Sequence, residues 1–289
     1  MKKLIIILGV VGTSLSVPFV RFSNAPSMVL VLYRMAFATV ILLPYILIKN
    51  RDEIKFLHIK EIILCLISGI FLGFHFSCYF ESLNYTSIAS AVVLVDTEVF
   101  FVAFISLLLF KEKISKIGWF GIVITFAGSV IIALADSGSG SNVLLGDALA
   151  FSGAAFMAVY TIIGKIVRKN MTTTTYTFIV YFMAGITVLI VLLISGKPIF
   201  GYDRINFLTA LGMAVCCTLL GHSIFSWGLK YESASFVSTV ILLEPVFATI
   251  TGIFLFGETP SLTVVIGGII VIAGIYTYSN YAEKYFKQK

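Results

Sequence analysis

Ten apolar runs occupy most of this 289-residue chain, and each is long enough to cross a lipid bilayer as a helix. A membrane-spanning helix needs about 20 mostly apolar residues, because the hydrocarbon core is about 30 Å thick and a helix rises about 1.5 Å per residue. The short segments between the runs are rich in Gly, Pro, Ser and Asn, which end helices. The sequence therefore predicts an all-α integral membrane protein with ten transmembrane helices, at approximately residues 4–20, 28–48, 61–80, 87–110, 117–135, 145–166, 175–194, 207–228, 235–256 and 262–281.

The composition leaves no room for a soluble domain. Hydrophobic residues make up 59% of the chain and charged residues 12%, whereas a soluble domain carries about 25% charged residues. The first run follows Met1-Lys2-Lys3, as in a signal peptide, but no small-residue cleavage motif comes after it. We therefore expect this run to be retained as the first helix.

Lysine and arginine are divided unequally between the two sets of predicted loops. If the N-terminus is cytoplasmic, sixteen of them fall in cytoplasmic segments, three fall on the other side, and Arg34 lies inside a helix. The positive-inside rule then predicts that both termini are cytoplasmic. Because these charges are spread over short loops and form no basic patch, we expect no nucleic-acid partner.

The chain also contains an internal repeat. A shift of 146 residues, without a gap, pairs Glu98 with Glu244 and aligns several glycines of the two halves. Each half holds five predicted helices, an odd number, so the second half enters the membrane from the opposite side. The sequence therefore predicts two inverted five-helix repeats, at residues 1–137 and 143–289. Further aligned positions are Leu83 with Leu229, Ser87 with Ser233, Phe110 with Phe256, Gly121 with Gly267 and Gly128 with Gly274.

Inverted repeats have a mechanical consequence. The same fold placed upside down can adopt two slightly different conformations, and exchanging them moves access from one side of the membrane to the other. A substrate then binds near the middle of the bilayer, between the repeats. The chain has no Walker A pattern, so a proton gradient or the gradient of the solute itself would drive transport.

These motifs resemble those of the EamA-like branch of the drug/metabolite transporter superfamily. The resemblance rests on residues 83–90, on Tyr33-Arg34, and on the helix ends at Phe110-Lys111-Glu112 and Phe256-Gly257-Glu258. It implies a carrier with five plus five helices in the inner (cell) membrane, often an exporter of amino acids, metabolites or toxic compounds. Glu244-Pro245 also matches, but Val99 stands where the first repeat often has proline. A hinge-like helix break is therefore expected only at Pro245.

Six ionisable residues lie at membrane depth, where each costs at least a few kcal/mol without a partner or a cavity. Glu98 and Glu244 occupy equivalent positions in the fourth and ninth helices. They either form a proton or cation site shared by the two halves, or brace helix ends freed where the helices break. The other four are Arg34, His75, Asp96 and His222.

Asp96 and Glu98 are two residues apart, which is about 200° around a helix, so they cannot face the same narrow cavity. One is expected to face the substrate and the other a neighbouring helix, where Arg34 is a candidate partner. His75 and His222 either relay protons or donate hydrogen bonds to backbone carbonyls.

Aromatic residues four apart share a helix face, as His75 with Tyr79 and Phe156 with Tyr160 do. Such pairs would suit aromatic, cationic or zwitterionic substrates through stacking and cation–π contact. The alternative is ordinary packing, since the chain holds 26 Phe and 13 Tyr. Binding candidates are thus Glu98, Asp96, His75, Tyr79, Tyr160, His222, Glu244 and Arg34.

The leading hypothesis is a secondary transporter of a small organic solute, with export as the expected direction and proton coupling left open. Import of a cationic or zwitterionic nutrient is the alternative, since three midplane carboxylates outnumber Arg34. A membrane-embedded lipid-modifying enzyme finds no support in metal-ligand spacing, and a channel lacks a filter-like loop. We expect no cofactor and no metal. The glycine pairs Gly121/Gly128 and Gly267/Gly274 allow close helix contact, either within a monomer or in a homodimer.

Overall fold

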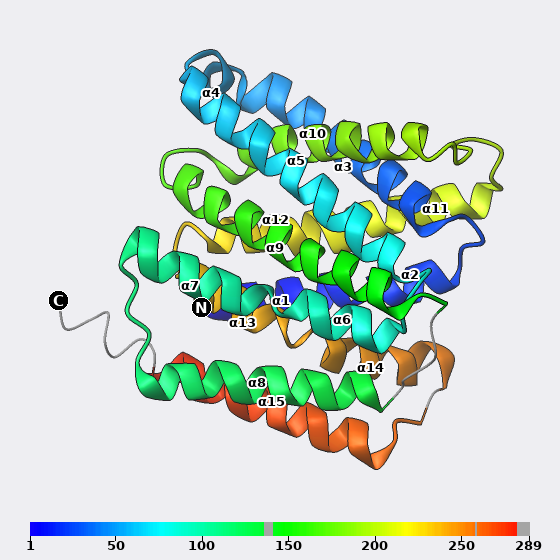
Figure 1. The fold of residues 1–289 in the computed structure, drawn as a ribbon. Coiled ribbons are helices and arrows are strands. Elements are labelled where there is room, and N and C mark those ends of the chain that lie inside the picture. The colour runs from blue at the N-terminus through cyan, green and yellow to red at the C-terminus, as the bar shows by residue number, and fades with distance from the viewer. Residues whose placement is uncertain (136–140, 258, 282–289) are drawn as a thin grey trace.

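The computed structural model describes residues 1–135, 141–257 and 259–281, and the regular elements within these ranges are all helices (Figure 1). Ten spans in the described residues are long and apolar enough to cross a membrane, which confirms the predicted architecture. The predicted repeat limit at residue 137 and the C-terminal Lys284, Lys287 and Lys289 lie outside the described residues. The spans are Lys2–Arg21, Ser27–Lys49, Ile59–Ser82, Ser90–Phe110, Lys116–Leu134, Val143–Val167, Thr173–Ile194, Arg204–Gly228, Ala234–Phe256 and Leu262–Asn280.

Several spans consist of more than one helix. In chain order the elements are α1 (Lys2–Ser14) and α2 (Ser16–Arg21), α3 (Ser27–Lys49), the short connecting α4 (Arg51–Lys55), α5 (Ile59–Ser82), α6 (Ile88–Asp96) and α7 (Glu98–Phe110), α8 (Lys116–Leu134), α9 (Val143–Val167), α10 (Thr173–Ile194), α11 (Arg204–Gly212) with the π-helix η1 (Met213–His222) and α12 (Ser223–Gly228), α13 (Ala234–Ile241) and α14 (Glu244–Phe256), and α15 (Leu262–Tyr281).

The packing of the spans repeats itself when the two halves are exchanged. α5 packs along α9, and the equivalent elements η1 and α1 pack together in the same way. α10 lies against α5, as α3 lies against α11 and η1. Two further pairs join a span to its own equivalent: α3 with α10, and α8 with α15, which run side by side along one edge of the bundle (Figure 1). This packing is the one predicted for two five-helix repeats that are inserted in opposite directions.

Helix ends repeat as well. The hydroxyls of Ser87 and Ser233 cap equivalent helices by accepting hydrogen bonds from the amides of Ser90 and Phe236. At the other end of the same two spans, Lys111 has φ 55° and Gly257 has φ 66°, both left-handed. A side chain disfavours this conformation. Lys111 adopts it nevertheless, so the helix end keeps one geometry in both repeats.

The glycine stripes lie inside the fold, between α8 and α15. A Cβ added at Gly128 would lie 2.7 Å from the Val271 amide nitrogen and 2.8 Å from the Gly267 carbonyl oxygen. The backbones of the two helices therefore touch, which small residues permit in a membrane. Of the two roles considered for these glycines, the structure shows contact within the fold.

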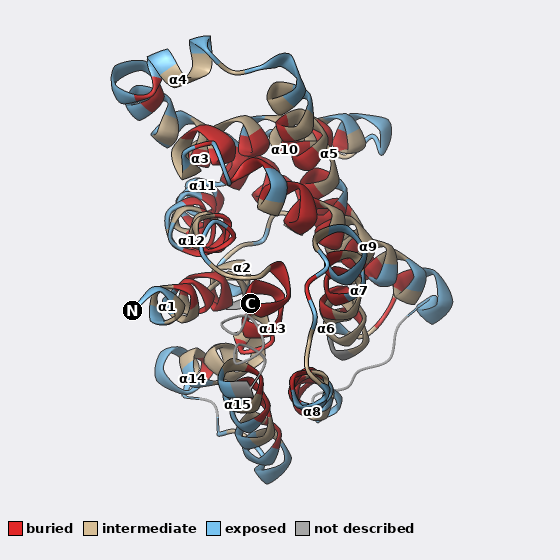
Figure 2. Cartoon of the chain, turned by 90° about the vertical axis from the view of Figure 1, so that its left-hand side faces the viewer, coloured by how far each residue is buried: buried red, intermediate tan, exposed pale blue. Residues whose placement is uncertain are grey.

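Buried residues gather on the faces that the spans turn toward one another, while exposed residues occupy the outer faces (Figure 2). Many exposed side chains are large and apolar, such as Leu4, Phe104, Phe254 and Ile269, as lipid contact requires. One end of the bundle carries Met1 and the connections 50–58, 111–115, 168–172 and 229–233. We call it the basic end, and the other the opposite end.

Candidate functional site

Two equivalent spans are broken at the same place. α6 ends at Asp96 and α7 begins at Glu98, while α13 ends at Ile241 and α14 begins at Glu244. The expectation of a break only at Pro245 is therefore wrong. At the first break Thr97 closes the turn without a proline, because its amide and its hydroxyl both donate to the Leu94 carbonyl, the hydroxyl at 2.5 Å. The hinge role of Pro245 stays a prediction.

Glu98 is the first residue of α7 and is only 4% exposed. Neither of its carboxylate oxygens has a hydrogen-bond partner, so the side chain does not cap the helix through hydrogen bonds. The partial positive charge of a helix N-terminus favours a carboxylate there. Asp96 and Glu244 lie close enough to interact with Glu98 electrostatically, so the three carboxylates form one acidic group.

Asp96 does not pair with Arg34. Its Oδ2 accepts a hydrogen bond of 2.5 Å from the hydroxyl of Ser129 on α8. Asp96 faces a neighbouring helix, as expected for one of these two carboxylates, but that helix is α8 and not α3. The predicted Arg34–Asp96 pair is wrong, because the last turn of α6 runs beside α8.

Arg34, on α3, is 2% exposed. Its Nε donates to Oγ1 of Thr218 at 2.6 Å, and the centre of its guanidinium lies 5.0 Å from the Phe76 ring centroid. Its Nη2 has no hydrogen-bond partner. Among the described residues no carboxylate lies within ion-pair distance of it, although Glu244 is near enough to act on it electrostatically.

The eighth span is a π-helix over Met213–His222, and it carries both Thr218 and His222. The wider turn shows in the hydroxyl of Thr218, which donates to the Met213 carbonyl five residues back, at 3.4 Å. π-Helical turns are rare and are frequently found at functional sites. Here the π-helix places a hydroxyl against Arg34.

The two histidines of the site, His75 and His222, differ in their hydrogen bonding. Nδ1 of His75 donates to the Gly153 carbonyl at 3.0 Å, which is the structural role considered for it. Its ring stacks on Tyr79, with centroids 6.3 Å apart, so the shared face of these two residues is confirmed. Nδ1 of His222 has no partner, and its ring meets that of Phe76 edge-on at 5.5 Å.

Tyr160 is held by hydrogen bonding and stacking. Its hydroxyl lies 3.0 Å from Oγ of Ser226, and its ring stacks on Tyr176 at 6.5 Å. Phe156 contacts Phe71 at 5.7 Å instead. The aromatic pair of Phe156 with Tyr160 is therefore not formed, because the two side chains meet different neighbours.

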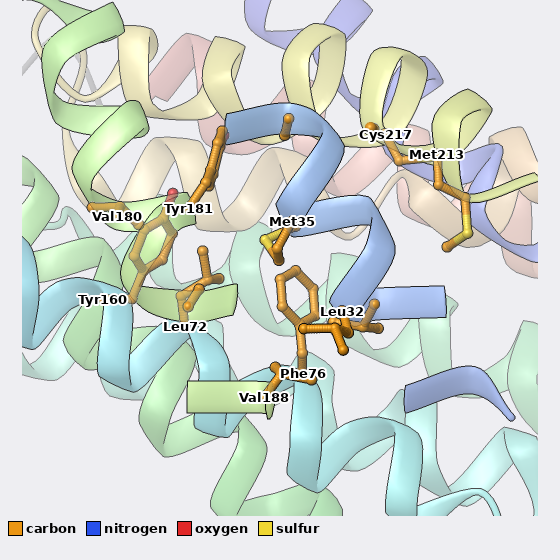
Figure 3. Close-up of a cluster of buried hydrophobic side chains, with 14 of the residues drawn as sticks. Leu32, Met35, Leu72, Phe76, Tyr160, Val180, Tyr181, Val188, Met213 and Cys217 are labelled. Atoms are coloured by element: carbon orange, nitrogen blue, oxygen red, sulfur yellow. The ribbon is translucent and has the colours of Figure 1, made fainter. Parts of the chain in front are cut away.

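The eight candidate residues thus meet around one centre. Arg34, His75 and His222 surround the ring of Phe76, which lies close to Leu32 and Met35 of α3 in Figure 3, and we call these three the Arg–His group. The acidic group consists of Asp96, Glu98 and Glu244. Tyr79 links the two, because it stacks on His75 and lies near Asp96 and Glu244. Tyr160 lies near Glu98.

Sequence reasoning missed the hydroxyl residues of the site. Thr218, Ser129 and Ser226 each hold one of the candidates through a hydrogen bond. Their signal is weak, since Ser and Thr are common in transmembrane helices, where their hydroxyls bond the preceding turn. Only the contacts in the folded structure distinguish these three residues from the other Ser and Thr residues of the helices.

At the basic end, hydrogen bonds join two segments of the second repeat. Lys165 donates to the carbonyls of Leu229 at 2.9 Å and Glu232 at 2.5 Å. Glu112 is buried nearby, and burial raises the pKa of its carboxyl, while the Lys165 ammonium opposes this shift. A cavity of about 440 Å³ beside Glu112 and Trp119 opens here, and none of the residues of the acidic group or the Arg–His group lines it.

The opposite end is also held by contacts between segments far apart in the chain. Lys197 forms an ion pair with Glu81 at 2.7 Å. The hydroxyl of Tyr33 donates to the Ile199 carbonyl, and the Asn206 side-chain oxygen accepts from Ser23 at 2.6 Å. The described residues therefore make connecting contacts at both ends of the bundle.

The fold and this centre define a class of protein: a membrane transporter built from two inverted five-helix repeats, with ionisable groups buried between them. The model of the EamA-like transporter family matches residues 2–134 and 144–280. This chain belongs to that family, as the sequence resemblance indicated.

Similar proteins are transporters as well. An uncharacterized transporter of Clostridium kluyveri is 32% identical over 69% of this chain and 66% of its own length, just under two thirds. An uncharacterized transporter of Archaeoglobus fulgidus is 27% identical over 86% of each chain. The pseudopaline exporter of Pseudomonas aeruginosa is 23% identical over 89% of this chain and 88% of its own. A solved crystal structure shares the fold, with a TM-score of 0.81 over 98% of both chains at 15% identity.

Proposed function

We propose that this chain is a secondary transporter that binds a small organic solute between its two repeats and exports it by alternating access. The observation that carries the proposal is the buried centre at the two equivalent helix breaks. There the carboxylate of Glu98 and the Nη2 of Arg34 lack partners inside the protein. Unpaired ionisable groups at membrane depth mark substrate and ion pathways.

The contacts at the two ends fit this mechanism. In alternating access one end of the repeat interface opens while the other stays closed. At the basic end Glu53 of the first repeat accepts a hydrogen bond from the Thr172 amide of the second at 2.7 Å, and at the opposite end Glu81 pairs with Lys197; opening would break these contacts. We further propose that the basic end faces the cytoplasm, with both termini on that side of a cell membrane.

Export is supported by one relative that is itself an exporter, the pseudopaline exporter of Pseudomonas aeruginosa. Its 23% identity supports a direction and not a shared substrate. The names of the relatives also favour transport over membrane-embedded enzyme activity. Import of a cationic or zwitterionic nutrient is the alternative that the test below separates from export.

The test is counterflow in proteoliposomes that hold the purified chain in a known orientation. Vesicles loaded with an unlabelled solute should accumulate the labelled solute, with a rate that saturates, and empty liposomes should not. Flux that rises linearly without exchange would instead indicate a channel. Efflux from the side of the basic end that exceeds influx supports export, and the reverse asymmetry supports import.

A further inference from the structure

Two arginines of this chain are buried to the same degree but are used differently. Arg34 and Arg168 are each 2% exposed. In Arg168, Nε donates to the Ser226 carbonyl at 3.0 Å, Nη1 to the Met171 carbonyl, and Nη2 to the Thr173 hydroxyl at 2.6 Å. Arg168 is therefore satisfied by the protein and fastens α9 to α12.

Arg34 is not satisfied in this way. Its Nε is bound by Thr218, but its Nη2 has no partner, and no carboxylate of the described chain lies within ion-pair distance. A guanidinium is always charged in proteins, so it cannot escape burial by losing a proton. An uncompensated buried charge is strongly destabilising. Glu244 acts on Arg34 only from beyond ion-pair distance, so Nη2 is left without a direct partner and is free to bind an anion.

The surroundings of Nη2 suit a bound group. Nδ1 of His222 is a second buried nitrogen without a partner, and the rings of His222 and Phe76 lie 5.5 Å apart. The face of Phe76 also lies 5.0 Å from the Arg34 guanidinium. The bond from Nε to Thr218 fixes one edge of the guanidinium and leaves Nη2 for a ligand. Arg34 is thus oriented before anything binds.

Resting on the proposed transport function, we propose that Arg34, positioned by Thr218 and aided by His222, binds the carboxylate of a zwitterionic solute. A carboxylate matches the planar fork of a guanidinium and accepts two parallel hydrogen bonds. The acidic group accommodates the amino group of the same solute, since Glu98 has two oxygens without partners.

The ligand-side experiment needs no variant. Wild-type protein in lipid nanodiscs is heated with matched sets of probes, namely amino acids, their methyl esters and the amines that lack the carboxyl group. The same probes then compete in counterflow. We expect the acids to protect and compete about tenfold more strongly than the esters and amines, the loss of one charge-assisted interaction. Equal potency of acid and ester overturns the inference, as does full protection by chloride or sulfate alone.

The experiments on variants measure selectivity for the acid over the ester, and not overall transport activity. Arg34→Met should bring the acid-to-ester ratio from about tenfold to about one, and Arg34→Lys should retain part of it, because the charge stays while the fork is lost. Thr218→Val should raise the KM for the acid more than that for the ester. Arg168→Lys is the matched control, in which melting should fall and the ratio should not change. A normal ratio in both Arg34 variants contradicts the proposal.

The two proposals fail in different ways. Saturable exchange of neutral or cationic solutes, without preference for a carboxylate, overturns the carboxylate site and leaves transport intact. Absence of saturable exchange for every solute in the panel overturns transport itself and the site with it.

Discussion

Arg34 of the first repeat donates a hydrogen bond from its Nε to Oγ1 of Thr218 of the second repeat at 2.6 Å, and both residues are buried. The bond joins α3 to the π-helix η1, the element that also ends in His222. Because it is formed by a buried charge, it contributes to stability as well as to the orientation of the guanidinium. The two repeats are therefore fastened at the place where we propose that the solute binds.

Replacing Thr218 by Val should destabilise the protein by about 1.5–3 kcal/mol, since it removes a hydrogen bond to a charged group and keeps the side-chain shape. Thermal unfolding of the wild type and the variant in detergent measures this loss of stability. Thr239→Val is the control, because the Thr239 hydroxyl bonds only the Ser235 carbonyl of its own helix, at 2.6 Å. A loss at Thr218 no larger than that at Thr239 would show that the bond does not matter.

A double-mutant cycle should separate the true partner of Asp96 from the rejected one. Asp96→Asn and Ser129→Ala should be coupled by about 1 kcal/mol or more, because their side chains share a hydrogen bond of 2.5 Å. Asp96→Asn and Arg34→Met should be additive within about 0.5 kcal/mol, as expected for residues without a shared contact. Melting of the single and double variants gives both coupling energies. Coupling to Arg34 of the size found for Ser129 would restore the pair that we reject.

Glu98→Gln should abolish or uncouple pH-dependent flux while leaving the fold intact. The side chain has no partner inside the protein, so a neutral residue of the same shape loses no hydrogen bond there. The variant does lose the ability to bind and release a proton. Counterflow at several pH values about one unit either side of neutrality checks this, with melting as the measure of folding. Glu61→Gln, at the first turn of α5, serves as the control. A wild-type pH profile in Glu98→Gln would remove Glu98 from the mechanism.

The ten spans, the inverted repeat and the equivalence of Glu98 and Glu244 could be predicted because hydrophobicity, loop charge and self-similarity are properties of the sequence alone. The partner of Asp96 could not, since the choice between Ser129 and Arg34 depends on how the last turn of α6 lies against α8. The break at Thr97 was missed for a related reason: a threonine that closes a helical turn leaves no signal comparable to proline.

Glu53 should make the basic end sensitive to acid. Its carboxylate accepts four hydrogen bonds, from the Asn50 side chain, the Thr172 amide and the hydroxyls of Thr172 and Thr175. Partial burial raises the pKa of Glu53, but these bonds outweigh it and hold the pKa below its ordinary value of 4.5. Because the folded pKa is depressed, the stabilisation is fully present above the ordinary pKa and is lost as the pH falls through the folded one.

Hydrogen exchange at residues 172–176 checks this prediction. Protection there should fall on acidification below the ordinary pKa of 4.5. In Glu53→Gln it should be lower at neutral pH and should lose this pH dependence, because a neutral amide cannot titrate. Asp52→Asn changes an exposed neighbour and is the control. Protection in Glu53→Gln that still falls on acidification in the same range would assign the effect to another group.

The contact between α8 and α15 offers a matched pair of glycines, Gly267 and Gly268, adjacent on the same helix. A Cβ at Gly267 would lie 2.7 Å from Cγ1 of Ile132 and 3.0 Å from the Gly128 carbonyl oxygen, whereas at Gly268 it would first meet Val246 at 3.9 Å. Both changes to alanine raise helix propensity by the same amount, about 1 kcal/mol, so the difference between them reports packing. Gly267→Ala should therefore be less stable than Gly268→Ala by about 1–3 kcal/mol, the cost of overpacking, and should melt at a lower temperature. Equal melting of the two variants would mean that the helices separate at little cost, and that the close glycine contact does not hold the two repeats together.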